Sequence, residues 1–392
     1  MKVAYVAESV APYRVGGMQA IARRHADGLK AHGFDVVLVH ASRRSEGGHE
    51  VPAASGPRER ELPWPARTGL LGRLPGHYAR DLVAYSRLVD AVLREEAPDV
   101  VYAEGPVVLH TLRSPRASRP PVVFHPHGLE PFQRLGRWRD DLRSRPMRPL
   151  LAAHAQRAER VLSQGGDLTR ILRERLGVPE ARLCVLPNGL PADALAERPR
   201  GPRRPRRFLF VGRDEPRKGL RLLVDAVLAL PEARLDVVGA NVPRRGVGAT
   251  ERIQSHGVVR DPAALRALYD SADVLVLPSL AEGMPTVLLE ALGRGIPVVA
   301  SAVGAVPDLV EDGVTGWLVP PGSPARLRAA LAAVLALPDE AYESLSRAAL
   351  SRVREGFLED RVVGRLATIL GEAASGERPA REPASPRAEA AT

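Results

Sequence analysis

Two glutamates, Glu282 and Glu290, are the residues whose types and spacing point most directly to chemistry. Pro285 and Thr286 stand between them, where a helix is expected to begin, because proline is tolerated in a first turn and a hydroxyl can cap free amides. A helix start offers unpaired N–H groups and a partial positive charge, which suit a phosphate or diphosphate. Carboxylates accept hydrogen bonds from paired hydroxyls, as on a ribose or a sugar ring. The implied ligand has hydroxyls at both ends and a phosphate between them, which describes a nucleotide-sugar.

The elements that would position these residues are a strand, a loop, a helix and a second strand. Residues 274–278 form a continuous apolar run bounded by turn formers, which is typical of a buried strand in a parallel sheet. The loop 279–283 follows it, and residues 296–300 form the next strand after the helix. The loop therefore lies at the carboxyl end of a parallel strand, where open α/β sheets bind ligands. Alone, two glutamates eight residues apart would fit a solvated helix face equally well.

The sequence around this pair is more specific. The stretch from Ser279 to Ser301, SLAEGMPTVLLEALGRGIPVVAS, resembles the signature of the retaining GT-B glycosyltransferases of the family 4 type. The resemblance covers residues 1 to about 372 and is strongest in 207–322. It implies an α/β fold of the GT-B architecture, with two Rossmann-like domains that face each other across a central cleft. It also implies that Glu282 binds hydroxyls of the donor sugar and that Glu290 binds the ribose.

The expected domains follow from this resemblance. We expect a Rossmann-like acceptor-side domain at 1–189, a linker rich in proline and arginine at 190–206, and a Rossmann-like nucleotide-sugar domain at 207–355. Residues 356–372 have an amphipathic pattern and would form a helix that crosses back to the first domain. Residues 373–392 are rich in Pro, Ala, Arg and Glu, and we expect them to be disordered.

Three further residues complete the predicted catalytic set with Glu282. Arg213 and Lys218 match the family's cation pair, which holds the donor diphosphate. Cations suit that place because cleavage of the glycosidic bond leaves negative charge on the departing diphosphate. His127, before Gly128 at a strand end, matches the family's histidine near the reacting carbon, where a neutral imidazole can orient a sugar hydroxyl. Exposed cations are more often solubilising and a lone histidine is more often structural, but the spacing here favours function.

The predicted donor-binding residues lie around loops and helix starts. A glycine pair before the first helix lets the backbone approach a diphosphate from the opposite domain, although it could serve only a tight turn. Gly239, which follows the predicted strand RLDVV of the second domain, is another candidate residue of the cleft. Val258, which follows RIQSHG, lies in the region where members of the family line the base of the nucleotide. The full predicted set is Gly16, Gly17, Gly239, Val258, Gly283, Met284, Pro285, Thr286 and Glu290.

No metal and no cofactor are expected, since the nucleotide-sugar is a co-substrate. The chain contains no Asp-x-Asp pair, so a metal-bridged diphosphate is not indicated. Its single cysteine, Cys184, excludes an internal disulfide and a cysteine metal site and fits a reducing compartment. Two fixed cations and a helix start can neutralise the diphosphate without a metal.

The charge balance is basic, with 56 Lys and Arg against 46 Asp and Glu, a net charge of +10. Such a balance can indicate nucleic acid, an anionic membrane or an anionic substrate. We expect no nucleic-acid partner, because no nucleic-acid fold signature accompanies the basic linker. The arginine-rich segment 131–150, with interleaved Phe132, Trp138 and Leu142, could meet a membrane or be a solvated face. With no secretory signal and no run of about 20 apolar residues, we expect a cytoplasmic protein, or one peripheral at the inner face of the membrane.

The resulting functional hypothesis is a retaining glycosyltransferase. By the resemblance to the family, its donor would be a UDP-sugar as the first choice and GDP-mannose as the second. Its acceptor would be a hydroxyl of a saccharide, a lipid-linked molecule or a small natural product. A GT-B-shaped sugar-nucleotide epimerase would use the same cleft but needs no acceptor. A noncatalytic nucleotide-sugar or nucleic-acid binding protein would fit the charge, but it gives no reason for Glu282, Glu290, Arg213 and Lys218.

Overall fold

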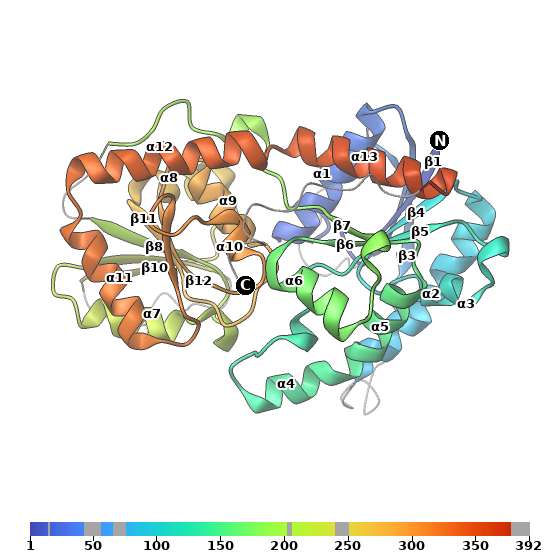
Figure 1. The fold of residues 1–392 in the computed structure, drawn as a ribbon, viewed down its shortest axis with the longest axis horizontal. Helices are drawn as coiled ribbons and strands as arrows, with labels where there is room; N and C mark the ends of the chain where they lie inside the picture. Colours follow the sequence, from blue (N-terminus) through green and yellow to red (C-terminus); the bar gives the residue numbers. More distant parts are fainter. Residues whose placement is uncertain (15, 43–55, 66–75, 202–205, 240–250, 378–392) are drawn as a thin grey trace.

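The structure is a computed structural model that describes residues 1–14, 16–42, 56–65, 76–201, 206–239 and 251–377. Figure 1 shows two lobes, each built around one sheet with helices on both faces. The predicted α/β class with two Rossmann-like domains is confirmed, because both sheets are open and doubly wound.

The sheet of the first domain has seven strands in the order β3-β2-β1-β4-β5-β6-β7, and every pair is parallel. Its central strands are continuous apolar runs because both faces of a parallel sheet are buried. The strands are β1 (Lys2–Val6), β2 (Asp35–Ser42), β3 (Arg58–Pro63), β4 (Val100–Glu104), β5 (Val122–His125), β6 (Arg160–Ser163) and β7 (Leu183–Val185).

The sheet of the second domain has six strands in the order β10-β9-β8-β11-β12-β13, again all parallel. The strands β11 and β12 lie where the sequence predicts them, side by side in the interior of the sheet. The strands are β8 (Arg207–Val211), β9 (Arg234–Val238), β10 (Ile253–Gly257), β11 (Val274–Leu277), β12 (Val298–Ser301) and β13 (Gly316–Val319).

Helices cover both faces of each sheet (Figure 1). In the first domain, Val3 and Tyr5 of β1 face a core shared with α1 and α13, while Ala4 and Val6 face a core shared with α2. This alternation is the two-residue period of a strand. The helices are α1 (Gly17–Ala31), α2 (His77–Glu96), α3 (Leu109–Arg113), α4 (Trp138–Ser144), α5 (Arg148–Arg157), α6 (Gly166–Arg170), α7 (Leu220–Leu228), α8 (Pro262–Ser271), α9 (Thr286–Leu292), α10 (Val306–Leu309), α11 (Pro324–Ala336), α12 (Asp339–Gly356) and α13 (Glu359–Ser375).

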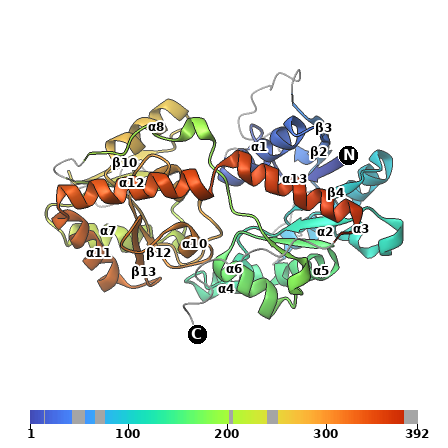
Figure 2. The same ribbon diagram turned by 45° about the horizontal axis from the view of Figure 1, so that its top comes forward.

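The last helix connects the two domains. α12 lies on the second domain, and α13 lies along α1 of the first domain in both Figure 1 and Figure 2. The contact is close, because a Cβ added to Gly28 of α1 would stand 2.9 Å from Cγ1 of Val363 in α13. The chain end of the second domain is therefore packed against the first.

The segment 43–79 is rich in Arg, Pro and Gly, a composition that predicts a long surface excursion of low order, but it contains a strand. β3 pairs with β2 at the edge of the first sheet, and α2 already begins at His77. β3 reads RERELP and has no apolar run, so its pattern resembles a solvated loop. Its arginines bind glutamates of α2 instead, with Arg58 Nη2 2.6 Å from Glu96 Oε2. Residues 43–55 and 66–75 lie outside the described residues.

The carboxyl-terminal bounds also differ from the prediction. Residues 373–375, expected to be disordered, belong to α13, which ends before Gly376 in the left-handed conformation (φ 78°). Gly356, expected to open the last helix, is the end of α12. Residues 378–392 of the predicted tail and 202–205 of the predicted linker lie outside the described residues.

Candidate active site

The predicted site residues gather at the carboxyl edges of both sheets. The strand order reverses between β1 and β4 in the first domain and between β8 and β11 in the second. Open α/β sheets bind ligands outside the strand ends at such a switch point. Arg213 follows β8, Glu282 follows β11 and Glu104 ends β4, while His127 comes just after the neighbouring β5.

Glu282 is buried and pairs with Lys218. Lys218 Nζ lies 2.5 Å from Glu282 Oε1, and Arg217 Nη1 lies 3.9 Å from Oε2. Lys218 ends a short 3-10 turn, after which Gly219 adopts a left-handed conformation (φ 71°) and α7 begins. A Cβ on Gly219 would collide with the carbonyl oxygen of Pro278, so this glycine allows the loops after β8 and β11 to touch. That contact brings the predicted cation and carboxylate together.

Arg213 is bound to a different carboxylate. Its Nη1 lies 2.8 Å from Glu215 Oε1, and Glu215 Oε2 also lies 2.9 Å from Nε of Arg217. The Arg213 side chain is 55% exposed. One surface carboxylate therefore holds two guanidinium groups beside the loop that carries Lys218. Sequence reasoning missed Arg217, which the lysine next to it could have indicated.

Two helices from opposite domains begin close together. A Cβ added to Gly17, the first residue of α1, would lie 2.6 Å from Oγ1 of Thr286, the first residue of α9. The first turns of both helices lack acidic residues, so nothing there opposes the partial positive charge of the helix starts. Together with Lys218, these helix starts can hold an anion between the domains.

Glu290 lies one turn into α9, as predicted from the sequence. Its Oε2 accepts a hydrogen bond from Tyr269 Oη at 2.7 Å. Burial raises the pKa of the Glu290 carboxyl, and the hydrogen bond from Tyr269 opposes that change. Tyr269, on α8, is a supporting residue that sequence reasoning missed because its helix lies outside the signature.

His127 lies at the carboxyl edge of the first sheet, just after β5, among buried polar groups. Its backbone is left-handed (φ 58°), and its ring stacks on His125 with the centroids 4.0 Å apart. His127 Nε2 lies 3.4 Å from Glu104 Oε1, and Glu104 Oε1 accepts a hydrogen bond from Tyr5 Oη at 2.6 Å. Nδ1 of His125 is 2.7 Å from Tyr102 Oη. Sequence reasoning missed Glu104, although it ends the apolar strand β4.

Glu104, His125 and His127 are close enough to be considered as metal ligands. The two rings, however, are nearly parallel, with an angle of 27° between their planes. A metal ion must lie near the plane of each imidazole at about 2.0–2.1 Å from its nitrogen. Two stacked rings do not satisfy this for one ion without a rotation, so this arrangement fits a cluster of polar side chains better than a metal centre.

Polar side chains of the first domain bind the backbone of the loop that follows β11 in the second domain. Met284 N donates to Gln164 Oε1 at 2.9 Å, and Asn188 Nδ2 donates to the carbonyl of Met284 at 2.6 Å. Gln133 Nε2 donates to the carbonyl of Glu282 at 2.8 Å. These contacts fix the backbone on both sides of Gly283. Gln164, Asn188 and Gln133 are not among the site residues predicted from the sequence.

The remaining predicted donor-binding residues have varied surroundings. Gly283 packs against Gly128, whose Cα would lie 3.2 Å from an added Cβ, and Pro285 caps α9 in an extended conformation. Gly16 precedes α1. Gly239 abuts the carbonyl oxygen of Gly212, so packing of the ends of β8 and β9 already requires a glycine there. Val258 follows β10 and is half-exposed.

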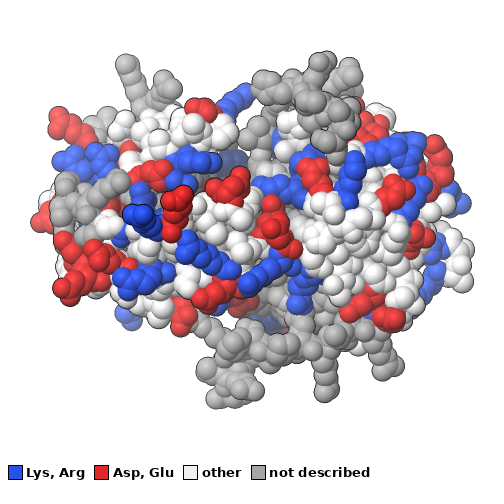
Figure 3. Space-filling model, turned by 90° about the horizontal axis from the view of Figure 1, so that it is seen from above, with Lys and Arg blue, Asp and Glu red and all other residues white. Residues whose placement is uncertain are grey.

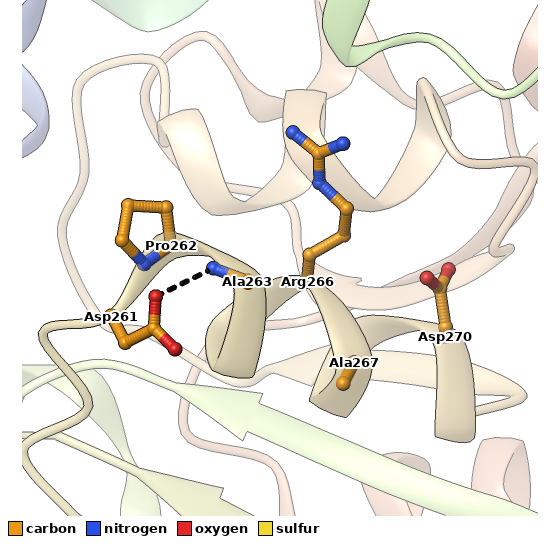
Figure 4. Close-up of a pocket in the computed structure, with 6 residues that line it drawn as sticks. All are labelled: Asp261, Pro262, Ala263, Arg266, Ala267 and Asp270. Atoms are coloured by element: carbon orange, nitrogen blue, oxygen red, sulfur yellow. Dashed lines mark hydrogen bonds between the residues drawn. The ribbon is translucent and has the colours of Figure 1, made fainter.

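A separate hollow lies on the outer face of α8 (Figure 4). Its lining side chains come from one helix and its cap. The Asp261 carboxylate there accepts hydrogen bonds from Ala263 N at 3.1 Å and Ala264 N at 3.2 Å, which is ordinary helix capping. The predicted catalytic residues do not line this hollow, so it is not the candidate active site.

Both halves of the chain match known families of sequence. Residues 15–194 match the model of glycosyltransferase family 4, and residues 205–336 match the model of glycosyl transferases group 1. The glycogen synthase of Mycobacterium tuberculosis (strain H37Rv) is 28% identical over 408 aligned positions, covering 96% of each chain. The phosphatidyl-myo-inositol mannosyltransferase of Mycobacterium leprae is 39% identical over 38% of this chain and 43% of its own.

Solved structures share the fold at low sequence identity. Sucrose-phosphate synthase from Thermosynechococcus elongatus aligns with a TM-score of 0.77 at 21% identity, covering 96% of this chain and 100% of its own. Anabaena HepE, solved in complex with UDP and glucose, aligns with a TM-score of 0.66 at 17% identity, covering 95% of this chain and 99% of its own. Since two glycosyltransferase family models match successive domains of one two-sheet chain, this protein is a glycosyltransferase of the GT-B type.

Proposed function

We propose that this glycosyltransferase transfers a sugar from a nucleotide-diphosphate sugar with retention at the anomeric carbon and without a metal ion. The observation that carries the proposal is the meeting of the Lys218–Glu282 pair with the starts of α1 and α9 at one edge between the domains. It provides a cation and amides for a diphosphate beside a carboxylate for sugar hydroxyls.

The proposed chemistry needs no protein nucleophile. The acceptor hydroxyl attacks from the face that the diphosphate leaves, the bond between the anomeric carbon and the phosphate oxygen breaks, and that oxygen takes the acceptor proton. Arg213 and Lys218 stabilise the charge that develops on the departing diphosphate. Glu282 binds donor-sugar hydroxyls and Glu290 binds the ribose. A sugar-nucleotide epimerase would instead convert the donor without acceptor, so product analysis separates the two reactions.

For the donor, we propose a UDP-sugar first and GDP-mannose second. The complex of Anabaena HepE with UDP and glucose supports the first choice, and the mannosyltransferase relative supports mannose as the second. The acceptor would be a hydroxyl of a saccharide, a lipid-linked molecule or a small natural product. No nucleic-acid partner is proposed, and Figure 3 shows cations and anions interspersed on the face over α12 and α13 rather than one basic stripe.

A peripheral membrane contact through 131–150 is a further part of this proposal. Trp138 and Leu142 of α4 are 69% and 50% exposed, and the Arg139 guanidinium lies 5.4 Å from the Trp138 ring centroid. Apolar side chains beside arginines suit an anionic membrane surface. Among the described residues, no helix is long and apolar enough to span a bilayer. Sedimentation with anionic vesicles should be lost in Trp138→Ala/Leu142→Ala but kept in the control Leu228→Ala.

The donor proposal is tested by a thermal-shift panel of UDP, GDP, ADP and their common sugars. A ligand at 100 times its dissociation constant should stabilise the fold by about 2.7 kcal/mol. We expect a selective shift with one nucleotide that Glu290→Ala abolishes, and a product with the anomeric configuration of the donor. No shift with any nucleotide would refute the proposed donor site.

A further inference from the structure

Glu104 is a buried carboxylate that the proposed mechanism does not use. It ends β4 at the switch point of the first sheet, and its Oε1 accepts a hydrogen bond from Tyr5 Oη at 2.6 Å. The same oxygen lies 3.4 Å from His127 Nε2. Among the described residues, no lysine or arginine forms an ion pair with Glu104. A single buried carboxylate is costly unless hydrogen-bond donors face it, so His127 is its natural second donor.

The His127 ring is held in place from several sides. Its backbone has φ 58°, a conformation that is unfavourable for a residue other than glycine and persists only where the surroundings impose it. The ring stacks on His125, which is in turn fixed by Tyr102 Oη at 2.7 Å from its Nδ1. Within the described part of the chain, neither ring nitrogen of His127 has a hydrogen-bond partner at ordinary distance.

The other histidines near Glu104 do not compete for its charge. Burial lowers the pKa of His25 to about 4 and the pKa of His125 well below its ordinary value. Both rings are therefore neutral at neutral pH. His127 is the histidine whose Nε2 faces the carboxylate and whose ring stands at the sheet edge beside the signature loop, since Gly128 touches Gly283.

We propose that Glu104 is a positioning residue for His127. The carboxylate accepts a hydrogen bond from Nε2–H of the imidazole, and the proton on Nε2 leaves Nδ1 as the acceptor for a hydroxyl of the donor sugar. The inference rests on the proposed function, because that function supplies the sugar. A separation of 3.4 Å is longer than a hydrogen bond, but hydrogen bonds among catalytic groups often tighten only in the substrate complex.

The first readout is the tautomer of His127, which does not depend on activity. In protein labelled with ¹⁵N-histidine, the His127 signals are assigned by their loss in His127→Ala. We expect Nε2–H in the wild type and a mixture of tautomers in Glu104→Gln, since an amide can face the ring with either its oxygen or its nitrogen. A wild-type ring protonated on Nδ1 alone would overturn the proposal, even if Glu104→Gln failed to fold.

The second readout is a double-mutant cycle with the same two substitutions. Glu104→Gln should lower kcat/KM about tenfold, within the range of coupling between contacting residues, and should leave UDP affinity and melting temperature close to those of the wild type. In a His127→Ala background the same substitution should have no further effect. An equal loss in both backgrounds would show that Glu104 acts independently of His127 and would refute the proposal.

The control is Tyr85→Phe, which removes another buried hydroxyl of the first domain, bonded to the carbonyl of Ala7 at 3.2 Å. It should leave kcat/KM unchanged. If the wild type binds no nucleotide-sugar, the proposed function fails, while the tautomer measurement still decides whether Glu104 sets the protonation of His127.

Discussion

Lys218 and Arg213 are both predicted to hold the donor diphosphate, but their surroundings differ. Lys218 neutralises the buried Glu282, whereas Arg213 is half-exposed and binds the surface carboxylate of Glu215. A surface ion pair contributes only about 0–1 kcal/mol to stability, while removing one partner of a buried pair costs more because it leaves a charge without its counterion. Substitution of Arg213 should therefore affect catalysis but not stability, whereas substitution of Lys218 should affect both.

Arg213→Ala should reduce kcat/KM by about 10²- to 10³-fold, by analogy with the loss of one oxyanion donor, because the charge on the leaving diphosphate is then less stabilised. Its melting temperature should stay near that of the wild type. Lys218→Ala should lower both kcat/KM and the melting temperature. Steady-state kinetics and thermal unfolding check this, with the exposed Arg328→Ala as control. Unchanged turnover in Arg213→Ala would refute its role.

Glu290, the proposed ribose ligand, lowers the stability of the folded protein. Burial raises the pKa of its carboxyl in the folded protein, so the ionised form is disfavoured there relative to the unfolded chain. This destabilisation is fully present above the raised folded pKa and disappears below the unfolded value of about 4.3. A neutral isostere should therefore stabilise the fold at high pH only.

Glu290→Gln should melt at a higher temperature than the wild type at pH 8, and the difference should vanish near pH 4. The variant should also bind nucleotide more weakly, since an amide is a poorer acceptor for ribose hydroxyls. Melting curves across pH and calorimetric titration with UDP measure both effects. The exposed Glu343→Gln on α12 should change neither. A lower melting temperature of Glu290→Gln than of the wild type at pH 8 would contradict the destabilisation attributed to the buried Glu290 carboxylate.

At the scale of elements, the contact of α1 with α13 depends on Gly28. A Cβ there would stand 2.9 Å from Cγ1 and 3.1 Å from Cγ2 of Val363, and valine methyl groups have little freedom to move. Gly28→Val should destabilise the protein by about 1–3 kcal/mol through overpacking. Denaturant unfolding measures this, and adding Val363→Ala should recover part of the loss.

Gly371 of α13 provides the matched control. Nothing lies within 4 Å of an added Cβ there, so Gly371→Ala should stabilise the protein by about 0.5–1 kcal/mol through helix propensity. If Gly28→Val and Gly371→Ala changed the free energy of unfolding equally, helix propensity rather than the contact between α1 and α13 would explain both changes.

The elements also show what the sequence can predict. β11, α9 and β12 lie where an apolar run, a proline–threonine start and a second apolar run predict them, because local pattern determines them. β3 was missed because an edge strand without an apolar run depends on partners distant in sequence. For the same reason Glu104, Gln164 and Tyr269 could not be predicted, since each has its role through a contact with another part of the chain.

At the scale of the whole molecule, the two domains meet through polar contacts to the loops after β11 and β12. Gly166 N, at the first residue of α6, donates to Asp308 Oδ2 at 2.6 Å, and Asp167 N donates to the carbonyl of Gly304 at 3.0 Å. Polar interfaces between domains usually permit relative motion. We therefore expect the approach of Gly17 to Thr286 to depend on these hydrogen bonds, which contribute a moderate free energy to the closed arrangement of the two domains.

Asp308→Ala should favour a more open arrangement of the two domains. A hydrogen bond to a charged group contributes about 1.5–3 kcal/mol, so its loss should weaken UDP binding about tenfold, provided that binding requires the closed arrangement. Small-angle scattering should show compaction of the wild type with UDP, and compaction of the variant only at higher UDP concentration. Asp167→Ala is the control, because the Asp167 side chain pairs with Arg170 of its own helix at 2.7 Å while its backbone contact remains. Equal affinity and equal compaction in Asp308→Ala would mean that the donor site forms without closure, and that Gly17 and Thr286 approach each other for packing alone.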